Sequence, residues 1–540
     1  MAMTDVASVL PVAAVAIPAV AIPLIYVSRS NPTLREAWTF VAALVTFAVV
    51  ATMVRSPVTH VSSLGSIAGI ELSLRGDAAG LLFALLASTL WVVTSVYSVG
   101  YVRSLEEHGQ TRYFAAFAGS IAATMGVALA ANLLTLFVFY ELLTLATYPL
   151  VVHAGTKAAR AAGRTYIVYT LGGGVVAFAG VLLVAVLVGT LTFVPGGIAA
   201  LAATDSALAQ AAFVFLAVGF GVKAAVVPLY KWLPAAMVAP TPVSGLLHAV
   251  AVVKSGVFAL SRTVLYVFGP EAMWDLGVGL PLAVFAAATM VIAGLVGLRQ
   301  DNLKRGLAYS TISQLSYIVL GLAIATPLAV FGALLHVVAH AFMKITLFFV
   351  AGIVAVETGE KYVSDLAGVG RRLPVTMTVF AVAAAGLVGF PLVAGFVSKF
   401  TLVVGVAAGP APVFVAAYLV AGLLKLLYFW PIVYAAFFGQ RDGSTPASRH
   451  AFAPAHAGEE ARTAGSGTAA KSRHAATDGG DVAHRLGQVG WERRTLSTET
   501  TSLMLVPILV TVGFAVVLGV VPSYLPFWDL AETVVWEVFG

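Results

Sequence analysis

The sequence is divided into long apolar stretches of about 20 residues, the length that an α-helix needs to cross about 30 Å of hydrocarbon. Hydrophobic residues make up 60% of its 540 residues and charged residues only 10%, whereas soluble domains carry about 25% charged residues. The apolar runs are continuous and do not alternate, which excludes a transmembrane β-barrel. We predict an all-α polytopic membrane protein with about 14 transmembrane helices. They lie near residues 7–27, 37–54, 79–99, 114–131, 133–152, 165–188, 209–230, 243–268, 279–298, 306–324, 327–355, 375–405, 412–438 and 503–524.

Basic residues are distributed unevenly among the connections. Most lysines and arginines outside the apolar runs follow odd-numbered spans, whereas only Arg55, Arg75 and Arg262 follow even-numbered spans. Because cytoplasmic connections are enriched in Lys and Arg, this predicts a protein of the cytoplasmic membrane with both termini outside. The hydrophilic insert at residues 440–500 shows no apolar periodicity, so we expect a flexible cytoplasmic loop. A regulatory or partner-docking role for the loop is the alternative.

Composition removes several classes of function. The chain has no cysteine, which excludes disulfides, thiolate metal sites and a cysteine nucleophile. The run Gly172-Gly173-Gly174 lies inside an apolar span and lacks the Lys-Ser/Thr of a P-loop; it is more typical of close helix contact. The net charge of +6 comes without a basic patch interleaved with aromatic residues, so we expect no nucleic-acid partner and no cofactor.

A small set of ionisable residues falls at depth inside the predicted spans. Each one costs about 2.5–3.5 kcal/mol or more at a helix centre, so each requires a partner or a hydrated cavity. The set is Glu141, Lys223, His248, Lys254, His336, His340, Lys344, Lys399 and Lys425.

The lysines differ in how strongly their position indicates a function. Lys254 lies about 16 Å into its span at 1.5 Å per residue, too deep for its stem to reach an interface easily. Lys223 and Lys399 lie next to Pro and Gly residues that predict broken helices, which is where transporters build ion sites. Lys425 is central, but the sequence gives it no clear role.

Glu141 is the only carboxylate in the middle spans of the chain, and its natural partner is one of the lysines. A buried Glu–Lys pair has two charge states of comparable energy, so a proton arriving at a neighbouring lysine can shift the balance between them. The alternative is a fixed salt bridge that joins two helices.

His336, His340 and Lys344 stand four residues apart, which places them on one face of a helix. Histidine exchanges protons near neutral pH, so this stripe is a plausible proton relay. Two alternatives stay open. One is a metal site, against which the cationic Lys344 and the lack of a third ligand both count; the other is a pair of packing histidines.

Several motifs, in this order, resemble the antiporter-like family shared by Mrp cation/proton antiporters, respiratory complex I and membrane-bound hydrogenases. The resemblance covers roughly residues 70–440. It rests on Tyr140-Glu141-Leu142, Lys223, Pro228-Leu229-Tyr230-Lys231-Trp232-Leu233-Pro234, Ala239-Pro240-Thr241-Pro242-Val243-Ser244-Gly245-Leu246-Leu247-His248-Ala249, His340-Ala341-Phe342-Met343-Lys344, Gly389-Phe390-Pro391 and Gly395-Phe396-Val397-Ser398-Lys399.

The resemblance implies a 14-helix fold with two inverted five-helix repeats, each containing one broken helix. The repeats would occupy residues 114–268 and 279–438. Residues 1–113 would form helices 1–3, residues 439–500 the loop, and residues 501–540 helix 14. The family roles would make Glu141 and Lys223 the coupling pair, Lys254 with His248 the central relay, His336, His340 and Lys344 its continuation, and Lys399 the exit lysine.

The function implied is that of a proton-translocating subunit of a multisubunit Na⁺ or K⁺/H⁺ antiporter, most similar to the D-type subunit of Mrp antiporters. Its partners would be other subunits, the transported ions and the lipid bilayer. It would perform no covalent chemistry. One alternative couples the same proton path to a redox complex, either NADH–quinone oxidoreductase or a membrane-bound hydrogenase. The other is a scaffold that anchors partners through residues 440–500.

Overall fold

A computed structural model describes the chain except for residues 1–3, 68, 441–490, 492–493 and 496–497. The loop expected at 440–500 therefore lies almost entirely outside the described residues. The long helices are α1 (Leu10–Val27), α2 (Pro32–Val54), α3 (Ala78–Ser104), α4 (Gln110–Ala128), α5 (Leu133–Val151), α6 (Lys157–Val188), α8 (Ser206–Lys223), α10 (Thr241–Ala249), α11 (Val252–Arg262), α13 (Gly279–Leu298), α14 (Leu303–Ile324), α15 (Pro327–Thr358), α16 (Pro374–Val388), α17 (Ala394–Ala407), α18 (Val415–Phe438), α20 (Ser502–Val520) and α21 (Pro526–Phe539).

Shorter elements connect these helices. They are β1 (Asp5–Ala7), β2 (Thr59–Ile67), β3 (Ile70–Arg75), α7 (Ala199–Ala202), α9 (Trp232–Ala235), α12 (Pro270–Asp275), the π-helical turn η2 (Thr263–Phe268) and the 3₁₀ turns η1 (Ala236–Val238), η3 (Val363–Asp365), η4 (Val369–Arg371), η5 (Pro412–Phe414) and η6 (Pro522–Tyr524).

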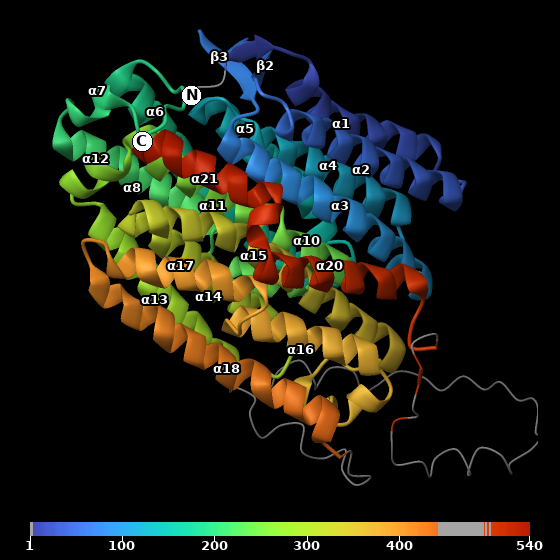
Figure 1. Ribbon diagram of the computed structural model, residues 1–540. Helices are drawn as coiled ribbons and strands as arrows, with labels where there is room; N and C mark the ends of the chain where they lie inside the picture. The colour runs from blue at the N-terminus through green and yellow to red at the C-terminus, as the bar shows by residue number, and fades with distance from the viewer. Residues whose placement is uncertain (1–3, 68, 441–490, 492–493, 496–497) are drawn as a thin grey trace, which may run out of the picture.

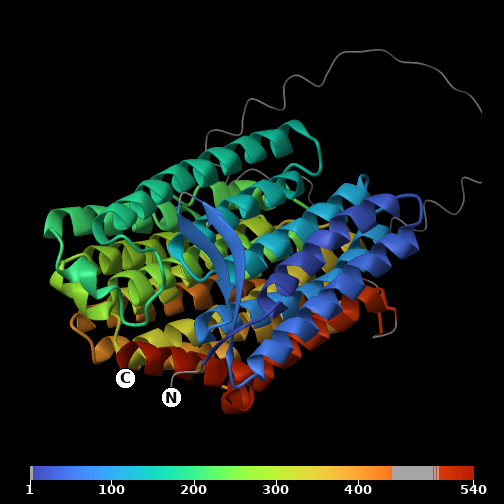
Figure 2. The ribbon, with the colours of Figure 1, turned by 90° about the horizontal axis from the view of Figure 1, so that it is seen from above.

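The long helices lie side by side in one elongated bundle, with most axes in a similar direction (Figures 1 and 2). Within the described residues, 12 helical segments are long and apolar enough to cross a membrane. In Thr241–Phe268, every residue of the most apolar 18-residue window is buried. In the corresponding windows of α14 and α15, 94% of the residues are buried, compared with 28% in α1. The chain from α10 to η2, with α14 and α15, therefore forms the centre of the bundle.

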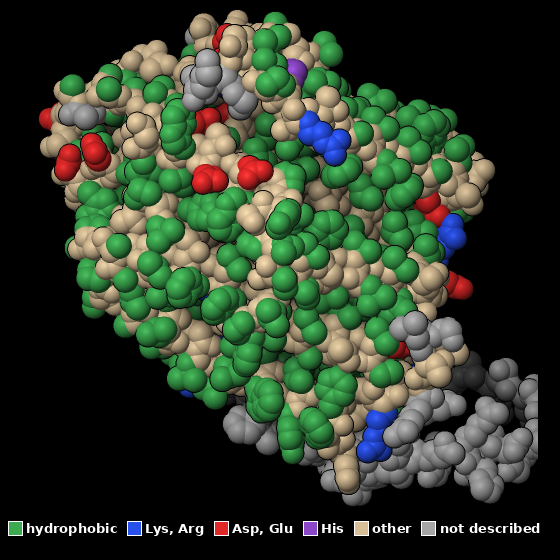
Figure 3. Space-filling model, in the orientation of Figure 1, with side chains coloured by type: hydrophobic (Ala, Val, Ile, Leu, Met, Phe, Trp, Pro, Cys, Tyr) green, Lys and Arg blue, Asp and Glu red, His purple; other side chains and the backbone are tan. Residues whose placement is uncertain are grey.

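The outer helices expose apolar side chains. Val175 and Val186 on α6 are 72% and 81% exposed, which would be unfavourable in water but suits contact with lipid tails. Figure 3 shows one face covered mostly by hydrophobic side chains with few charged ones. This surface confirms a multi-pass membrane protein.

Each predicted apolar segment coincides with a helix or with a pair of helices. The structure differs from the prediction where a segment expected to be one continuous helix is interrupted. The segment predicted at 375–405 is divided into α16 and α17, both too short to span alone. The segment at 209–230 stops being helical after Lys223, and the segment at 243–268 is interrupted at Val250 and Ala251. The total of 14 spans and the inverted repeats stay predictions.

The break between α16 and α17 follows from its sequence. Gly389 ends α16 with a φ of 111°, and Leu392 has a φ of 70°. Pro391 between them has no amide hydrogen to continue the helix. A positive φ is accessible to glycine at little cost, so Gly389 provides the turn at which the chain leaves the helix.

A small sheet at one end of the bundle was not predicted. Its order is β1-β2-β3, with β1 parallel to β2 and β2 antiparallel to β3. Asp5 lies opposite Thr59, and Val61 lies opposite Arg75. In Figure 1 the sheet lies at the same end of the bundle as the C-terminal part of α21.

The C-terminal helix α21 is a second difference, because residues 501–540 were expected to hold one helix. The buried residues Phe527, Ala531 and Val534 lie on one side of α21, which packs on α3 and α15. At 100° per residue, Asp529 and Glu532 lie on the opposite side, whereas Glu537 lies about 90° from the buried side. The helix is amphipathic and does not qualify as a span.

The assignment of Arg262 to a connection was wrong. Arg262 is the last residue of α11, has no exposed surface, and forms an ion pair with Asp77, the N-cap residue of α3, at 2.5 Å. A guanidinium at this depth requires such a counter-charge, and only the fold brings Asp77, far away in the sequence, beside it.

Candidate functional site

The buried titratable residues predicted from the sequence gather on the central helices. Glu141 is on α5, Lys223 on α8, His248 on α10, Lys254 on α11, His336, His340 and Lys344 on α15, Lys399 on α17 and Lys425 on α18. All are buried except Glu141, which is half-buried. Within the described residues none of the basic members of this set has a carboxylate within 4 Å.

Lys223 is the last residue of α8 and points at α5. Its ammonium donates to the carbonyl of Tyr140, and Nζ lies 3.4 Å from the centroid of the Tyr140 ring. A lysine at a helix C-terminus also faces the negative end of the helix dipole. The side chain thus rests beside Glu141 without forming a direct ion pair with it.

Glu141 is held against α6. A Cβ atom at Gly174 would lie 2.3 Å from its Oε1, so the absence of a side chain at Gly174 makes room for the carboxylate. Oε1 is buried and has no hydrogen-bond partner among the described residues. Glu141 and Lys223 nevertheless lie close enough for their charges to interact.

Lys254 is buried on α11, and its ammonium has no hydrogen-bond partner among the described residues. The end of α8 packs closely here, because a Cβ atom at Gly256 would lie 2.4 Å from the backbone nitrogen of Ala224. Gly256 therefore brings Lys223 and Lys254 onto adjacent turns of two touching helices.

His248 lies on α10, on the other side of the interruption at Val250. Neither ring nitrogen has a hydrogen-bond partner among the described residues, and the ring centroid lies 4.8 Å from that of Phe348 on α15. Unpartnered buried polar atoms are usually satisfied by internal water. Lys254 and His248 thus mark where the protein interior needs hydration.

The three predicted residues of α15 differ in their contacts. His336 Nδ1 lies 2.9 Å from the hydroxyl of Ser398, and Nε2 lies 2.7 Å from Oε1 of Gln314. His340 has no partner on either ring nitrogen within the described residues, and its ring centroid is 6.2 Å from that of His336. The charges of Lys254, Lys344 and His248 all act on His340, so it lies where the groups of α10, α11 and α15 meet.

Lys344 extends from α15 to α14. Its ammonium donates to the hydroxyl of Ser310 at 3.0 Å and to the carbonyl of Leu307 at 3.3 Å. Both acceptors are neutral, so no described residue places a fixed negative charge against the lysine.

Lys399 lies after the break between α16 and α17 and bonds to backbone carbonyls at the end of α16. Its ammonium donates to the carbonyls of Leu387 and Val388, which belong to the last turn of α16, where helical carbonyls lack partners within the helix. Lys425 donates to Ser313 at 2.8 Å and to the carbonyl of Ala421. Both ammonium groups face the ring of Tyr317, at 4.9 Å for Lys399 and 4.4 Å for Lys425, so Lys425 belongs to this end of the site.

The sequence reasoning missed a polar stripe on α14. In this stripe Ser310 contacts Lys344, Ser313 contacts Lys425 and Gln314 contacts His336. The ring of Tyr317 faces the ammonium groups of Lys399 and Lys425. The spacing of these α14 residues, i, i+3, i+4 and i+7, marks one face of a helix. This pattern inside an apolar span is the signal that could have identified them.

These residues make up a buried set of polar side chains, called the path below, on helices from α5 to α18; within it Lys254, His248 and His340 have no hydrogen-bond partner among the described residues. It is made of amines, imidazoles and neutral hydroxyl or amide groups, which can accept and release protons or hold water. Covalent chemistry is not suggested by this set.

Comparison with known proteins identifies the family to which this path belongs. Residues 130–425 match the family described as "NADH:quinone oxidoreductase/Mrp antiporter, TM", and this range includes Glu141 and all the buried lysines and histidines of the path. The chain belongs to this family.

Its relatives work in different complexes. The chain is 36% identical over 371 residues to NADH-quinone oxidoreductase subunit N of Desulforudis audaxviator, covering 68% of this chain and 73% of the relative. It is 33% identical over 391 residues to a probable K⁺/H⁺ antiporter A/B subunit of Rhizobium meliloti, covering 71% of this chain but only 38% of that protein.

Solved structures agree on the fold. A chain of the Mrp complex from Dietzia sp. DQ12-45-1b aligns with a TM-score of 0.78 at 23% identity, over 98% of this chain and 99% of the other. A chain of respiratory complex I from Thermus thermophilus aligns with a TM-score of 0.75 at 20% identity, over 98% and 100%. These similarities show a shared membrane fold.

Proposed function

We propose that this protein is a proton-translocating membrane subunit of a multisubunit monovalent cation/H⁺ antiporter, similar to the D-type subunit of Mrp antiporters. The observation that carries the proposal is the buried path of titratable side chains from Lys223 to Lys399, whose basic members have no carboxylate within 4 Å among the described residues. If these side chains served only to form structural salt bridges, each lysine would have a carboxylate beside it. A proton carrier needs groups whose charge can change.

The mechanism begins at Glu141 and Lys223. A proton that reaches this region changes the charge balance between the two side chains, and their mutual interaction passes the change to Lys254 on the adjacent helix α11. Lys254, His340 and Lys344 take up and release the proton in turn, with His248 holding water beside them. Lys399 releases it at the break between α16 and α17.

Coupling to another cation is an energetic relationship between charge states. The protonation of one member shifts the populations of its neighbours, and this shift can drive another ion only through the difference in its binding free energy between the states. Other subunits of the complex supply the site for that ion or part of it.

The proposed setting is the cytoplasmic membrane, with both termini outside. The repeats proposed at residues 114–268 and 279–438 each contain a helix that breaks beside a lysine, after Lys223 in α8 and before Lys399 in α17. Equivalent broken helices in the two halves are typical of inverted-repeat transporters, which supports this arrangement.

The test is the pair of variants Glu141→Ala and Lys223→Ala in the assembled complex. Dissipation of ΔpH on adding Na⁺ or K⁺ would be followed in everted vesicles. Both variants should lose most of the flux, whereas Lys157→Ala, which removes an exposed lysine at the start of α6, should retain it. Wild-type flux in Glu141→Ala or Lys223→Ala contradicts the proposed coupling pair.

A redox-driven complex is the second candidate. The 36% identity to an NADH-quinone oxidoreductase subunit N favours it specifically. The same proton path would then respond to electron transfer in partner subunits. Identification of the subunits that co-purify with the chain distinguishes the two, because iron–sulfur subunits support the redox complex and small membrane subunits support the antiporter.

A further inference from the structure

The end of the expected cytoplasmic loop is packed against the helix bundle. Trp491 donates its indole N–H to the carbonyl of Ala367 at 2.9 Å, in the connection between α15 and α16. Arg494 contacts the end of α15, and Glu499 contacts the start of α16. These three side chains, Trp491, Arg494 and Glu499, are called the clamp below. None of them was recognised from the sequence.

Glu499 is a fully buried carboxylate at the start of α16. Its Oε1 accepts a hydrogen bond from the amide of Thr376 at 2.7 Å, and its Oε2 accepts one from the amide of Val375 at 3.1 Å. The first amides of a helix have no acceptor within the helix itself. A buried carboxylate is costly unless it is hydrogen-bonded, so Glu499 and the start of α16 stabilise each other.

The segment that begins α16 provides no cap of its own. Its N-cap residue is Leu373, which makes no side-chain hydrogen bond to the helix. Helices are usually capped by Ser, Thr, Asp or Asn at this position, as α14 is by Asn302. The carboxylate that caps α16 instead comes from a residue 123 positions after Thr376. The start of α16 therefore depends on the distant Glu499.

Arg494 connects this cap to α15. Its Nη1 lies 2.9 Å from Oε2 of Glu357, a residue in the last turn of α15. The same nitrogen donates to the carbonyl of Thr498 at 3.3 Å, which fixes the turn that carries Glu499. The clamp therefore holds the start of α16 against the end of α15.

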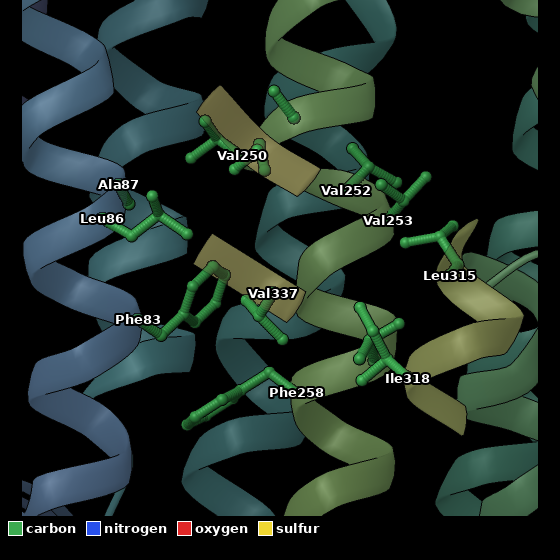
Figure 4. Packing of buried hydrophobic residues seen from close by; sticks show 14 of the residues in the cluster. Phe83, Leu86, Ala87, Val250, Val252, Val253, Phe258, Leu315, Ile318 and Val337 are labelled. Carbon is green, nitrogen blue, oxygen red and sulfur yellow. The ribbon is translucent and has the colours of Figure 1, made fainter. Parts of the chain in front are cut away.

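The middle of α15 is a firm support for this attachment. In Figure 4 Val337 of α15 lies among Phe83 of α3, Phe258 of α11 and Ile318 of α14. The space that these side chains enclose is only about 10 Å³, roughly the room for one water molecule. Because close-packed interiors transmit a displacement instead of absorbing it, the clamp holds α16 relative to a fixed helix.

The other end of α16 holds Lys399. The helix has 15 residues and is therefore about 22 Å long. In its last turn the carbonyls of Leu387 and Val388 accept hydrogen bonds from the ammonium of Lys399. Negative charge at the start of a helix and positive charge at its end both complement the helix dipole. Glu499 and Lys399 thus stabilise α16 from opposite ends.

The end of α16 packs too closely to shift freely. A Cβ atom at Gly395 of α17 would collide with the carbonyl of Gly386, and a Cβ atom at Gly386 would collide with Met343 of α15. A movement of α16 along its axis would also displace the carbonyls that hold Lys399. A misplacement of about 1 Å can slow a reaction about 100-fold, so the axial position of α16 matters for proton transfer at Lys399.

We propose that Glu499 is a positioning residue for Lys399. It caps α16 and, through Arg494, fixes the start of this helix to α15, so that the carbonyls at its other end stay where Lys399 binds them. Its hydrogen bonds go to backbone amides of α16 and not to a member of the path, so it acts through the helix. The role of Lys399 in proton transfer rests on the proposed function, whereas the position that Glu499 gives to α16 does not.

The test combines two measurements on the assembled complex. One is amide hydrogen exchange in lipid nanodiscs, read by mass spectrometry, and the other is proton flux in proteoliposomes. Glu499→Ala removes both acceptors and should speed exchange of the Gly389 and Phe390 amides, which bond to the carbonyl of Ala385, by about tenfold. Flux should also fall by about tenfold. Glu499→Gln keeps one acceptor oxygen and should lie between Glu499→Ala and wild type in both measurements.

Two further variants complete the experiment. Asn31→Ala is the matched control, because it removes the cap of α2, a helix that carries no member of the path; its exchange at Gly389 and its flux should equal those of wild type. Arg494→Ala loosens the clamp by removing a partly exposed side chain. It should speed exchange and lower flux by about threefold, and it provides the test if Glu499→Ala does not assemble.

The two measurements separate this proposal from the proposed function. Wild-type exchange at Gly389 in Arg494→Ala and in every Glu499 variant that assembles, or an equal increase in Asn31→Ala, would overturn it. Wild-type flux in Glu499→Ala, in a complex in which Lys254→Met has lost flux, would also overturn it. If the wild-type complex shows no proton flux, the proposed function fails, and faster exchange at Gly389 in Glu499→Ala still supports the position assigned to Glu499.

Discussion

The imidazole Nδ1 of His336 lies 2.9 Å from the hydroxyl of Ser398, the residue immediately before Lys399. This contact joins α15, which carries the histidine stripe, to the half-helix α17, which carries the exit lysine. Because a hydroxyl can both donate and accept a hydrogen bond, Ser398 can pass a proton between the two elements without carrying a charge itself.

Ser398→Ala should therefore interrupt the path at its last step. We expect proton flux in the assembled complex to fall by about tenfold, the effect of one lost hydrogen bond in a buried network, while the protein still folds. Thr401→Val on the same helix is the matched control, because its hydroxyl bonds only to the carbonyl of Val397 in its own helix. Equal flux in the two variants would show that Ser398 only packs against His336.

Gly174 tests the position of Glu141. A methyl group at Gly174 would lie 2.3 Å from Oε1 of Glu141 and would displace the flexible end of that side chain, whereas a methyl group at Gly172 meets no atom within 4 Å. Gly174→Ala should reduce cation-dependent proton flux by about tenfold, and Gly172→Ala should leave it unchanged. If flux in the two variants is the same, the carboxylate does not need its present position.

Tyr317 lies between Lys399 and Lys425, and its ring faces both ammonium groups. A cation–π contact contributes about 0.5–2 kcal/mol. Tyr317→Phe keeps the ring and loses only the bond from the hydroxyl to the carbonyl of Tyr418, so its flux should stay within about threefold of wild type. Tyr317→Leu removes the ring and should reduce flux by more than about tenfold. A loss of flux of more than about threefold in Tyr317→Phe would show that proton transfer depends on the hydroxyl of Tyr317 and not on its ring.

Glu537 predicts a dependence of stability on pH. Burial and Asp77 raise its pKa in the folded protein to about 7, above its ordinary value of 4.5. A raised pKa in the folded state means that the stabilising contribution is complete below about pH 4.5 and is lost as the pH rises through about 7. The melting temperature of wild type should therefore fall more between pH 5 and pH 8 than that of Glu537→Gln. A parallel decrease in the two proteins would show that Glu537 does not titrate in this range.

The residues of the path could be predicted from the sequence because lipid makes charge at depth rare. Lys254 and His340 stand out in apolar spans, and Pro391 with Gly389 indicates a broken helix. Ser310 and Gln314 are neutral, and such residues are common in membrane helices; only their shared helical face in the sequence marks them, and their partners are known only from the fold.

Other features depend on contacts between distant parts of the chain. The interruption between α10 and α11 consists of Val250 and Ala251 and therefore contains neither glycine nor proline. The pairing of Arg262 with Asp77 joins residues 185 positions apart. Local sequence patterns contain no signal for either, because both result from how α3, α10 and α11 pack.

The central claim is that the buried basic side chains carry protons, and Lys254 tests it most directly because it has no hydrogen-bond partner among the described residues. Lys254→Met keeps the length and apolar stem of the side chain but cannot bind a proton, and Lys157→Met at an exposed position controls for the loss of a lysine. The measurement is proton flux in proteoliposomes that contain the assembled complex. The account predicts that Lys254→Met loses about 100-fold in flux while Lys157→Met equals wild type; undiminished flux in Lys254→Met would contradict it.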